Sequence, residues 1–219
     1  MKKAIIAIAL AAIANVAAAA VGASVHNLSS SGAQGANSTT AETCIFCHTA
    51  HATNTAITAA PLWNRAALGA VTWSMYTSTT LLNTIGAAPG ANSLTCLACH
   101  EGSANMGGVY NIGGSASAPT AGTFFTVAAT MTAAGLVGSD LRNDHPVGVV
   151  YDNTIKTNLV AAATVTGAGA SGGLKLYAGA GATLTVECAS CHDPHVTTNG
   201  NFLRKSNAAS ALCTTCHVN

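Results

Sequence analysis

Cysteine and histidine are the residues of this chain whose type and spacing indicate chemistry. The sequence of 219 residues contains eight of each, and every cysteine belongs to a C-x-x-C-H motif. The cysteines of the four motifs are Cys44 and Cys47, Cys96 and Cys99, Cys188 and Cys191, and Cys213 and Cys216. This motif is the attachment signature of c-type haem, since two thiols three residues apart on one helical turn reach both vinyl groups of one porphyrin. The spacing therefore predicts four covalently bound haems.

The histidine that ends each motif is the expected proximal ligand of a haem iron. These histidines are His48, His100, His192 and His217. Paired cysteines also occur in zinc ribbons, but a zinc ribbon does not need a histidine directly after each second cysteine. An even cysteine count in an exported chain would otherwise favour disulfides. Because all four motifs carry the histidine and no cysteine is left over, the pattern favours haem over both alternatives.

Four further histidines match the number of distal ligands that four haems require. They are His26, His51, His145 and His195. We therefore expect each iron to be held by two imidazoles, at low potential relative to His/Met cytochromes and without an open coordination position. The alternative axial residues, Met75, Met106 and Met131, are expected to pack against other side chains instead.

Two of these histidines lie three residues after a proximal histidine: His51 follows His48, and His195 follows His192. On a helical turn, side chains three residues apart share one face. Two such imidazoles cannot bind one iron from opposite sides, so the second must reach a neighbouring haem. This arrangement holds two porphyrins close together, as rapid electron transfer between them requires.

The order of the ligands repeats along the chain. A lone histidine, a C-x-x-C-H-x-x-H motif and a C-x-x-C-H motif occur in residues 21–135 and again in residues 136–219, which predicts two duplicated two-haem units in one continuous haem-cored body. The repeat predicts that His51 ligates the haem of Cys96 and Cys99, His195 that of Cys213 and Cys216, His145 that of Cys188 and Cys191, and His26 that of Cys44 and Cys47. His26 comes early enough in the chain to reach a neighbouring molecule instead.

Residues 1–20 have the features of a secretory signal peptide. A positive start, Met1-Lys2-Lys3, precedes an uncharged stretch rich in alanine, and Ala18 and Ala20 provide an A-x-A cleavage signal. The alternative is a retained membrane anchor, since the uncharged run continues to Val25. Alanine contributes little to membrane insertion. We therefore expect cleavage, and an exported chain without a membrane span.

The composition predicts a fold organised by its cofactors. Only 7% of the residues are charged and 5% are aromatic, so large side chains for a conventional core are scarce. We expect mostly irregular coil, short helices at the haem motifs with Gly102 ending the second, and a minor β-hairpin that pairs residues 157–166 with 174–187, around four haems that supply the missing core. The aromatic side chains are expected to pack on porphyrin faces rather than to relay electrons; these are Trp63, Trp73, Tyr76, Phe124 and Phe125.

Several segments resemble the doubled-CxxCH multihaem cytochromes, and the low-charge body resembles the OmcE-like tetrahaem cytochromes among them. The segments are residues 44–51, 61–65, 96–102, 143–148 and 191–195. The family more often has proline where this chain has Ala50. The resemblance implies extracellular filaments with a continuous chain of haems, in which one axial histidine crosses between subunits; by its position, that histidine is His26.

These observations favour an electron-transfer protein, a filament that carries electrons to external acceptors, on the cell surface or outside the cell. The alternative is a monomeric periplasmic shuttle that docks with redox partner cytochromes. The low charge favours the filament, because transient docking usually uses a charged patch. It also argues against nucleic-acid binding, which requires a basic face. An enzyme would need an open haem position, and eight histidines for eight axial sites leave none.

Overall fold

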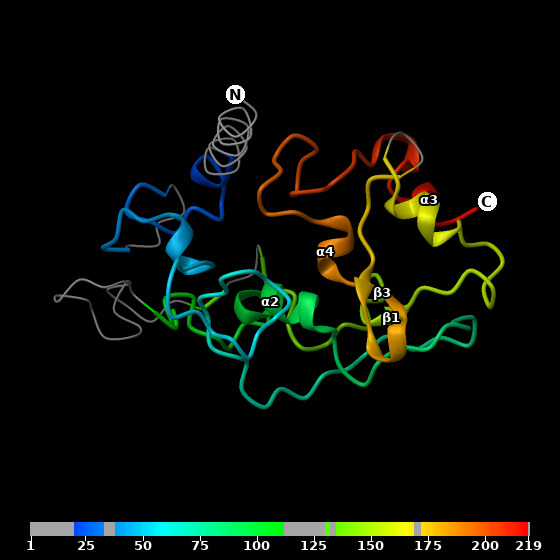
Figure 1. Ribbon diagram of the computed structural model, residues 1–219, viewed down its shortest axis with the longest axis horizontal. Coiled ribbons are helices and arrows are strands. Elements are labelled where there is room, and N and C mark those ends of the chain that lie inside the picture. Colours follow the sequence, from blue (N-terminus) through cyan, green and yellow to red (C-terminus); the bar gives the residue numbers. More distant parts are fainter. Residues whose placement is uncertain (1–19, 33–37, 112–129, 132–134, 169–171, 219) are drawn as a thin grey trace, which may run out of the picture.

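The computed structural model describes residues 20–32, 38–111, 130–131, 135–168 and 172–218. Most of these residues are in irregular coil, as expected. The elements are η1 (Cys44–Phe46), α2 (Ala91–His100), β1 (Val149–Val150), α3 (Ala162–Thr166), β2 (Tyr177–Ala178), η2 (Ala180–Ala182), β3 (Leu184–Val186), α4 (Cys188–Cys191), η3 (Ala208–Ser210) and η4 (Cys213–Thr215). Helices α2 and α4 contact each other near the centre of the molecule (Figure 1). Residues 1–19 of the expected signal peptide lie outside the described residues, as do Phe124 and Phe125.

Helix α2 is the longest helix among the described residues and contains the second motif. Its sequence, ANSLTCLACH, begins after Gly90 and has no glycine or proline to interrupt it. Glu101 follows as the last helical position, and Gly102 then adopts a φ of +95°, the left-handed conformation that commonly ends a helix. The prediction that Gly102 ends this helix is confirmed.

The sheet is antiparallel and has three short strands in the order β1-β3-β2. Val149 pairs with Val186, and Tyr177 pairs with Thr185. The prediction that residues 157–166 form one strand of the hairpin is wrong, because the second half of that segment forms helix α3. The hairpin lies within residues 174–187, between β2 and β3, and β1 pairs with the free edge of β3. Two alanines at the start of α3 favour helix over the strand that its Thr-Val-Thr sequence suggested.

The apolar core consists of small, separate clusters. Phe46 and Val109 form one cluster, against which Met106 packs as expected. Tyr151, Val165 and Leu174 form another. Globular interiors are normally close-packed around one contiguous core, so clusters of this size leave much of the interior to another component. No helix in the described part of the chain is both long and apolar enough to cross a bilayer.

Candidate haem-binding site

Each C-x-x-C-H motif forms a single helical turn. The histidine N–H donates to the carbonyl of the first cysteine in three motifs: His48 to Cys44 at 2.8 Å, His192 to Cys188 at 3.1 Å and His217 to Cys213 at 2.9 Å. The remaining motif, which is the second along the chain, lies inside α2, whose backbone has the same pattern. This turn places both sulfurs and the imidazole of a motif on neighbouring positions, as attachment of one porphyrin requires.

No disulfide joins any of the eight cysteines. Among the described residues there is no group of three or more histidine, cysteine or acidic side chains that could hold a metal ion directly.

The imidazoles of three of the four proximal histidines are oriented by backbone carbonyls. Nδ1 of His48 donates to the carbonyl of Pro61 at 2.8 Å, and Nδ1 of His100 donates to that of Gly135 at 2.6 Å. His192 does the same to Asn201 at 2.8 Å. A carbonyl only accepts hydrogen bonds, so Nδ1 carries the proton and Nε2 is left as a metal-ligating atom.

Six of the eight histidines lie in facing pairs. The ring centroids are 6.1 Å apart for His26 and His100, 6.2 Å for His48 and His195, and 6.3 Å for His145 and His217. Two imidazoles bound through nitrogen to opposite sides of one metal have centroids roughly 6 Å apart, because a metal–imidazole bond is about 2 Å long. The spacing of all three pairs fits two axial ligands of one iron.

These pairs differ from the pairing that the repeat predicts. The structure brings His26 to the motif of Cys96 and Cys99, not to that of Cys44 and Cys47. It brings His195 to His48 and His145 to His217. His51 and His192 have no ring contact in the described structure, and both side chains are exposed.

Burial keeps several of these imidazoles neutral. Burial, together with smaller effects of the nearby His100 and His195, lowers the pKa of His26 to about 4. It also lowers the pKa of His48 and of His217. Only a neutral imidazole binds a metal, so these three rings are in the ligating form at neutral pH. Nδ1 of His26 is buried and has no hydrogen-bond partner.

The motifs lie next to one another around α2 and α4. The thiol of Cys96 donates a hydrogen bond to the sulfur of Cys188, which raises the pKa of Cys96 and lowers that of Cys188 to about 7. Burial raises the pKa of Cys47 to about 12, and the neighbouring Cys99 adds to this effect. The attachment sites of the first three motifs are therefore contiguous.

Sequence reasoning assigned no role to several side chains that support these motifs. Asp193 accepts hydrogen bonds from Nδ1 of His195 at 3.1 Å and from Arg204 at 2.7 Å; the bond from His195 lowers the pKa of Asp193. Trp63, which was expected to pack on a porphyrin face, lies beside His48, with ring centroids 6.1 Å apart. The side chain of Asn64 is fully buried. Two features of the sequence could have indicated these supporting roles. They are the segment Pro61–Arg65 and the order His192-Asp193-Pro194-His195.

A known family model, the doubled CXXCH motif, matches residues 182–219. The match covers the third and fourth motifs and the histidine at position 195. No curated protein matches the chain. Together with the two further motifs upstream, the match supports a multihaem c-type cytochrome, a haem-binding protein of electron transfer.

Proposed function

We propose that the chain is a tetrahaem c-type cytochrome that carries electrons along closely spaced haems and polymerises outside the cell. The facing histidine pairs carry this proposal, because three pairs with metal-bridging separations are associated with three of the four attachment motifs. Each haem supplies a one-electron Fe(III)/Fe(II) couple. The residues of the chain hold the porphyrins through thioethers, present Nε2 to the iron and exclude water from the space between the motifs.

The ring separations support one axial pair at each of three motifs. His48 and His195 would hold the haem of Cys44 and Cys47. His100 and His26 would hold that of Cys96 and Cys99. His217 and His145 would hold that of Cys213 and Cys216. The haem of Cys188 and Cys191 then has His192 on one side and lacks a facing imidazole within the chain.

The two histidines without facing rings supply the link between subunits in this proposal. His51 of one molecule would bind the haem beside His192 of the next. The crossing ligand is thus His51 rather than His26, because His26 is half-buried and faces His100. Both His51 and His192 are exposed, so a neighbouring molecule can reach them. Low overall charge also supports close association, since self-repulsion is weak.

The alternative is a monomeric shuttle, in which the haem beside His192 keeps an exchangeable sixth position. Electron microscopy of the haem-containing protein released from cells distinguishes the two. We expect thin fibres for the wild type and for His26→Ala, and discrete particles for His51→Ala. All three proteins should carry four haems by pyridine haemochrome assay. Discrete particles for the wild type would contradict polymerisation and favour the shuttle.

A further inference from the structure

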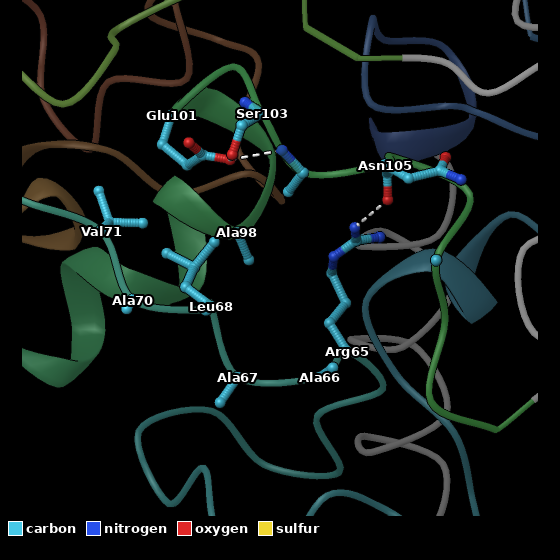
Figure 2. Close-up of a pocket in the computed structure, with 13 residues that line it drawn as sticks. Arg65, Ala66, Ala67, Leu68, Ala70, Val71, Ala98, Glu101, Ser103 and Asn105 are labelled. Carbon is cyan, nitrogen blue, oxygen red and sulfur yellow. Dashed lines mark hydrogen bonds between the residues drawn. The ribbon is translucent and has the colours of Figure 1, made fainter.

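Arg65 places a positive charge in the interior beside two attachment motifs. Its side chain is 3% exposed. The guanidinium donates to the carbonyl of Asn105 at 2.6 Å and to that of Met106 at 2.8 Å. Figure 2 shows it pointing at Asn105 in the wall of a cavity of about 260 Å³, which Arg65 lines together with Ala98 of α2. Arg65 has no ion pair with any described carboxylate, so its charge is held by neutral carbonyls.

Arg65 lies beside the first motif. The N–H of the preceding Asn64 donates to the carbonyl of Cys47 at 2.9 Å, and Met106, whose carbonyl accepts from Arg65, packs on the same apolar cluster as Cys47. Burial raises the pKa of Cys47 and of Cys99, and the Arg65 charge opposes that rise at both sulfurs. The guanidinium therefore lies within electrostatic reach of two neighbouring attachment sites. Glu101, which is 8% exposed, acts in the opposite direction on Cys99 but not on Cys47.

Glu187 places a negative charge in the interior beside the third motif. It is 2% exposed and immediately precedes Cys188. Its carboxylate accepts hydrogen bonds from the hydroxyl of Ser93 at 2.5 Å and from the backbone N–H of Gly90 at 3.2 Å. It also accepts from the backbone of Ser190 at the start of α4. The carboxylate thus joins the N-terminal ends of α2 and α4, where a negative charge is favourable.

No described cation forms an ion pair with Glu187. The negative charge of Glu187 raises the pKa of the Cys188 thiol, whereas the hydrogen bond from Cys96 lowers it. The charge of Arg204 lowers the pKa of the other cysteine of this motif, Cys191, but Arg204 forms an ion pair with Asp193 at 2.7 Å, whereas Glu187 has no such partner among the described residues. Glu187 therefore supplies the uncompensated charge at this motif.

We propose that Arg65 and Glu187 set haem potentials in opposite directions, higher at Cys44 and Cys47 and lower at Cys188 and Cys191. This inference depends on the proposed haems at these motifs. Reduction adds one electron to a haem, so a nearby buried cation favours the reduced form and a buried anion favours the oxidised form. The low dielectric of the interior strengthens both effects. Electrons at equilibrium therefore collect near the first motif and avoid the third.

Spectroelectrochemical titration of the haem-containing protein tests this pair of charges. Arg65→Gln removes the cation and should lower the reduction potential of the haem that titrates at the high-potential end of the curve. Glu187→Gln removes the anion and keeps a carbonyl acceptor, and should move the low-potential end upward. We expect each change to alter the ratio of reduced to oxidised haem about tenfold at a fixed potential, which is about 59 mV for a one-electron couple.

Matched variants separate charge from structure. Arg65→Lys and Glu187→Asp keep the charges and should titrate as the wild type does. Asp140→Asn removes one partner of an exposed ion pair, Asp140 with Arg142, and should also leave the curve unchanged. If Arg65→Gln does not fold, a low-end shift in Glu187→Gln still supports the inference, and an unchanged curve overturns it.

The haem assay distinguishes failure of this inference from failure of the proposed function. A wild-type protein without haem would refute both. A protein with four haems whose curves in both charge-removing variants match the wild type would refute only the opposing roles of Arg65 and Glu187.

Discussion

The imidazoles of His48 and His195 face each other with ring centroids 6.2 Å apart and planes inclined by 25°. His48 belongs to the first motif, and His195 follows the third motif by three residues. The pair therefore joins the two halves of the chain at a separation that fits one iron.

Removal of His195 should open one haem. In dissociated single chains, the wild type should bind one carbon monoxide, at the haem beside His192. His195→Ala should bind two, because the haem beside His48 then loses its distal ligand. The measurement is carbon monoxide titration of the reduced protein, followed by the Soret band.

His51→Ala is the matched control for that variant. It removes the other histidine that follows a motif by three residues, but leaves all three facing pairs intact. Single chains of this variant should bind one carbon monoxide, as the wild type does. Equal stoichiometry for His51→Ala and His195→Ala would contradict the axial pairs assigned from the structure.

The proposed number of four haems can be tested by removing one pair of cysteines. Replacement of both Cys213 and Cys216 by serine should lower the intact mass of the protein by the mass of one haem, because the thioethers of the fourth motif cannot form. Exhaustive treatment with a chelator should leave the wild-type mass unchanged, since thioether bonds are covalent. Loss of metal to the chelator without any porphyrin mass would instead favour zinc.

Asn64 should be important for stability. Its amide donates to the carbonyls of Ile45 at 2.6 Å and Asn111 at 2.7 Å, and its side-chain oxygen accepts from the N–H of Asn111 at 2.7 Å. Asn64→Ala would remove three hydrogen bonds made by a fully buried side chain, and we expect a loss of about 2–4 kcal/mol. Chemical unfolding followed by the Soret band measures it.

Asn92→Ala provides the comparison, because the half-buried Asn92 makes a single amide hydrogen bond, to the carbonyl of Ala59 at 3.1 Å. It should cost less than about 1 kcal/mol. Similar losses for both variants would show that the bonds of Asn64 contribute little.

Gly102 should not tolerate a side chain. Its φ is +95°, and an added Cβ would approach the side chain of Leu136. Gly102→Ala should cost about 1–2 kcal/mol, because an L-residue is strained in this conformation. Gly69→Ala is the control, since a Cβ there meets no atom within 4 Å. Equal unfolding midpoints for the two variants would exclude strain at Gly102 as a factor.

The sequence predicted what depends on local spacing. The helical turns at the motifs follow from cysteines three residues apart and an adjacent histidine, and Gly102 ends α2 as its residue type suggests. The low content of large side chains correctly indicated mostly coil. The small clusters around Phe46 and Val165 agree with the expectation of a limited conventional core.

The pairing of histidines could not be predicted in this way. His51 and His195 have the same local spacing, but only His195 meets another imidazole. The difference comes from contacts between distant segments: Asp193 accepts from Nδ1 of His195 and is held by Arg204, whereas His51 has no equivalent partner in the described structure. The burial of Arg65 and Glu187 is likewise a tertiary property. The pairing of β1 with β3 depends on chain packing that alternation alone does not encode.

The contact between His48 and His195 also has a consequence for the order of folding in the proposed export. If these residues bind one iron, the bond closes most of the chain into one loop, which restricts the unfolded chain as a long-range cross-link does. A chain exported from its N-terminus would deliver His48 long before His195. The proposed first haem site would then keep one axial position unfilled until the third motif had been translocated, so a truncated or stalled chain would not complete its own first site.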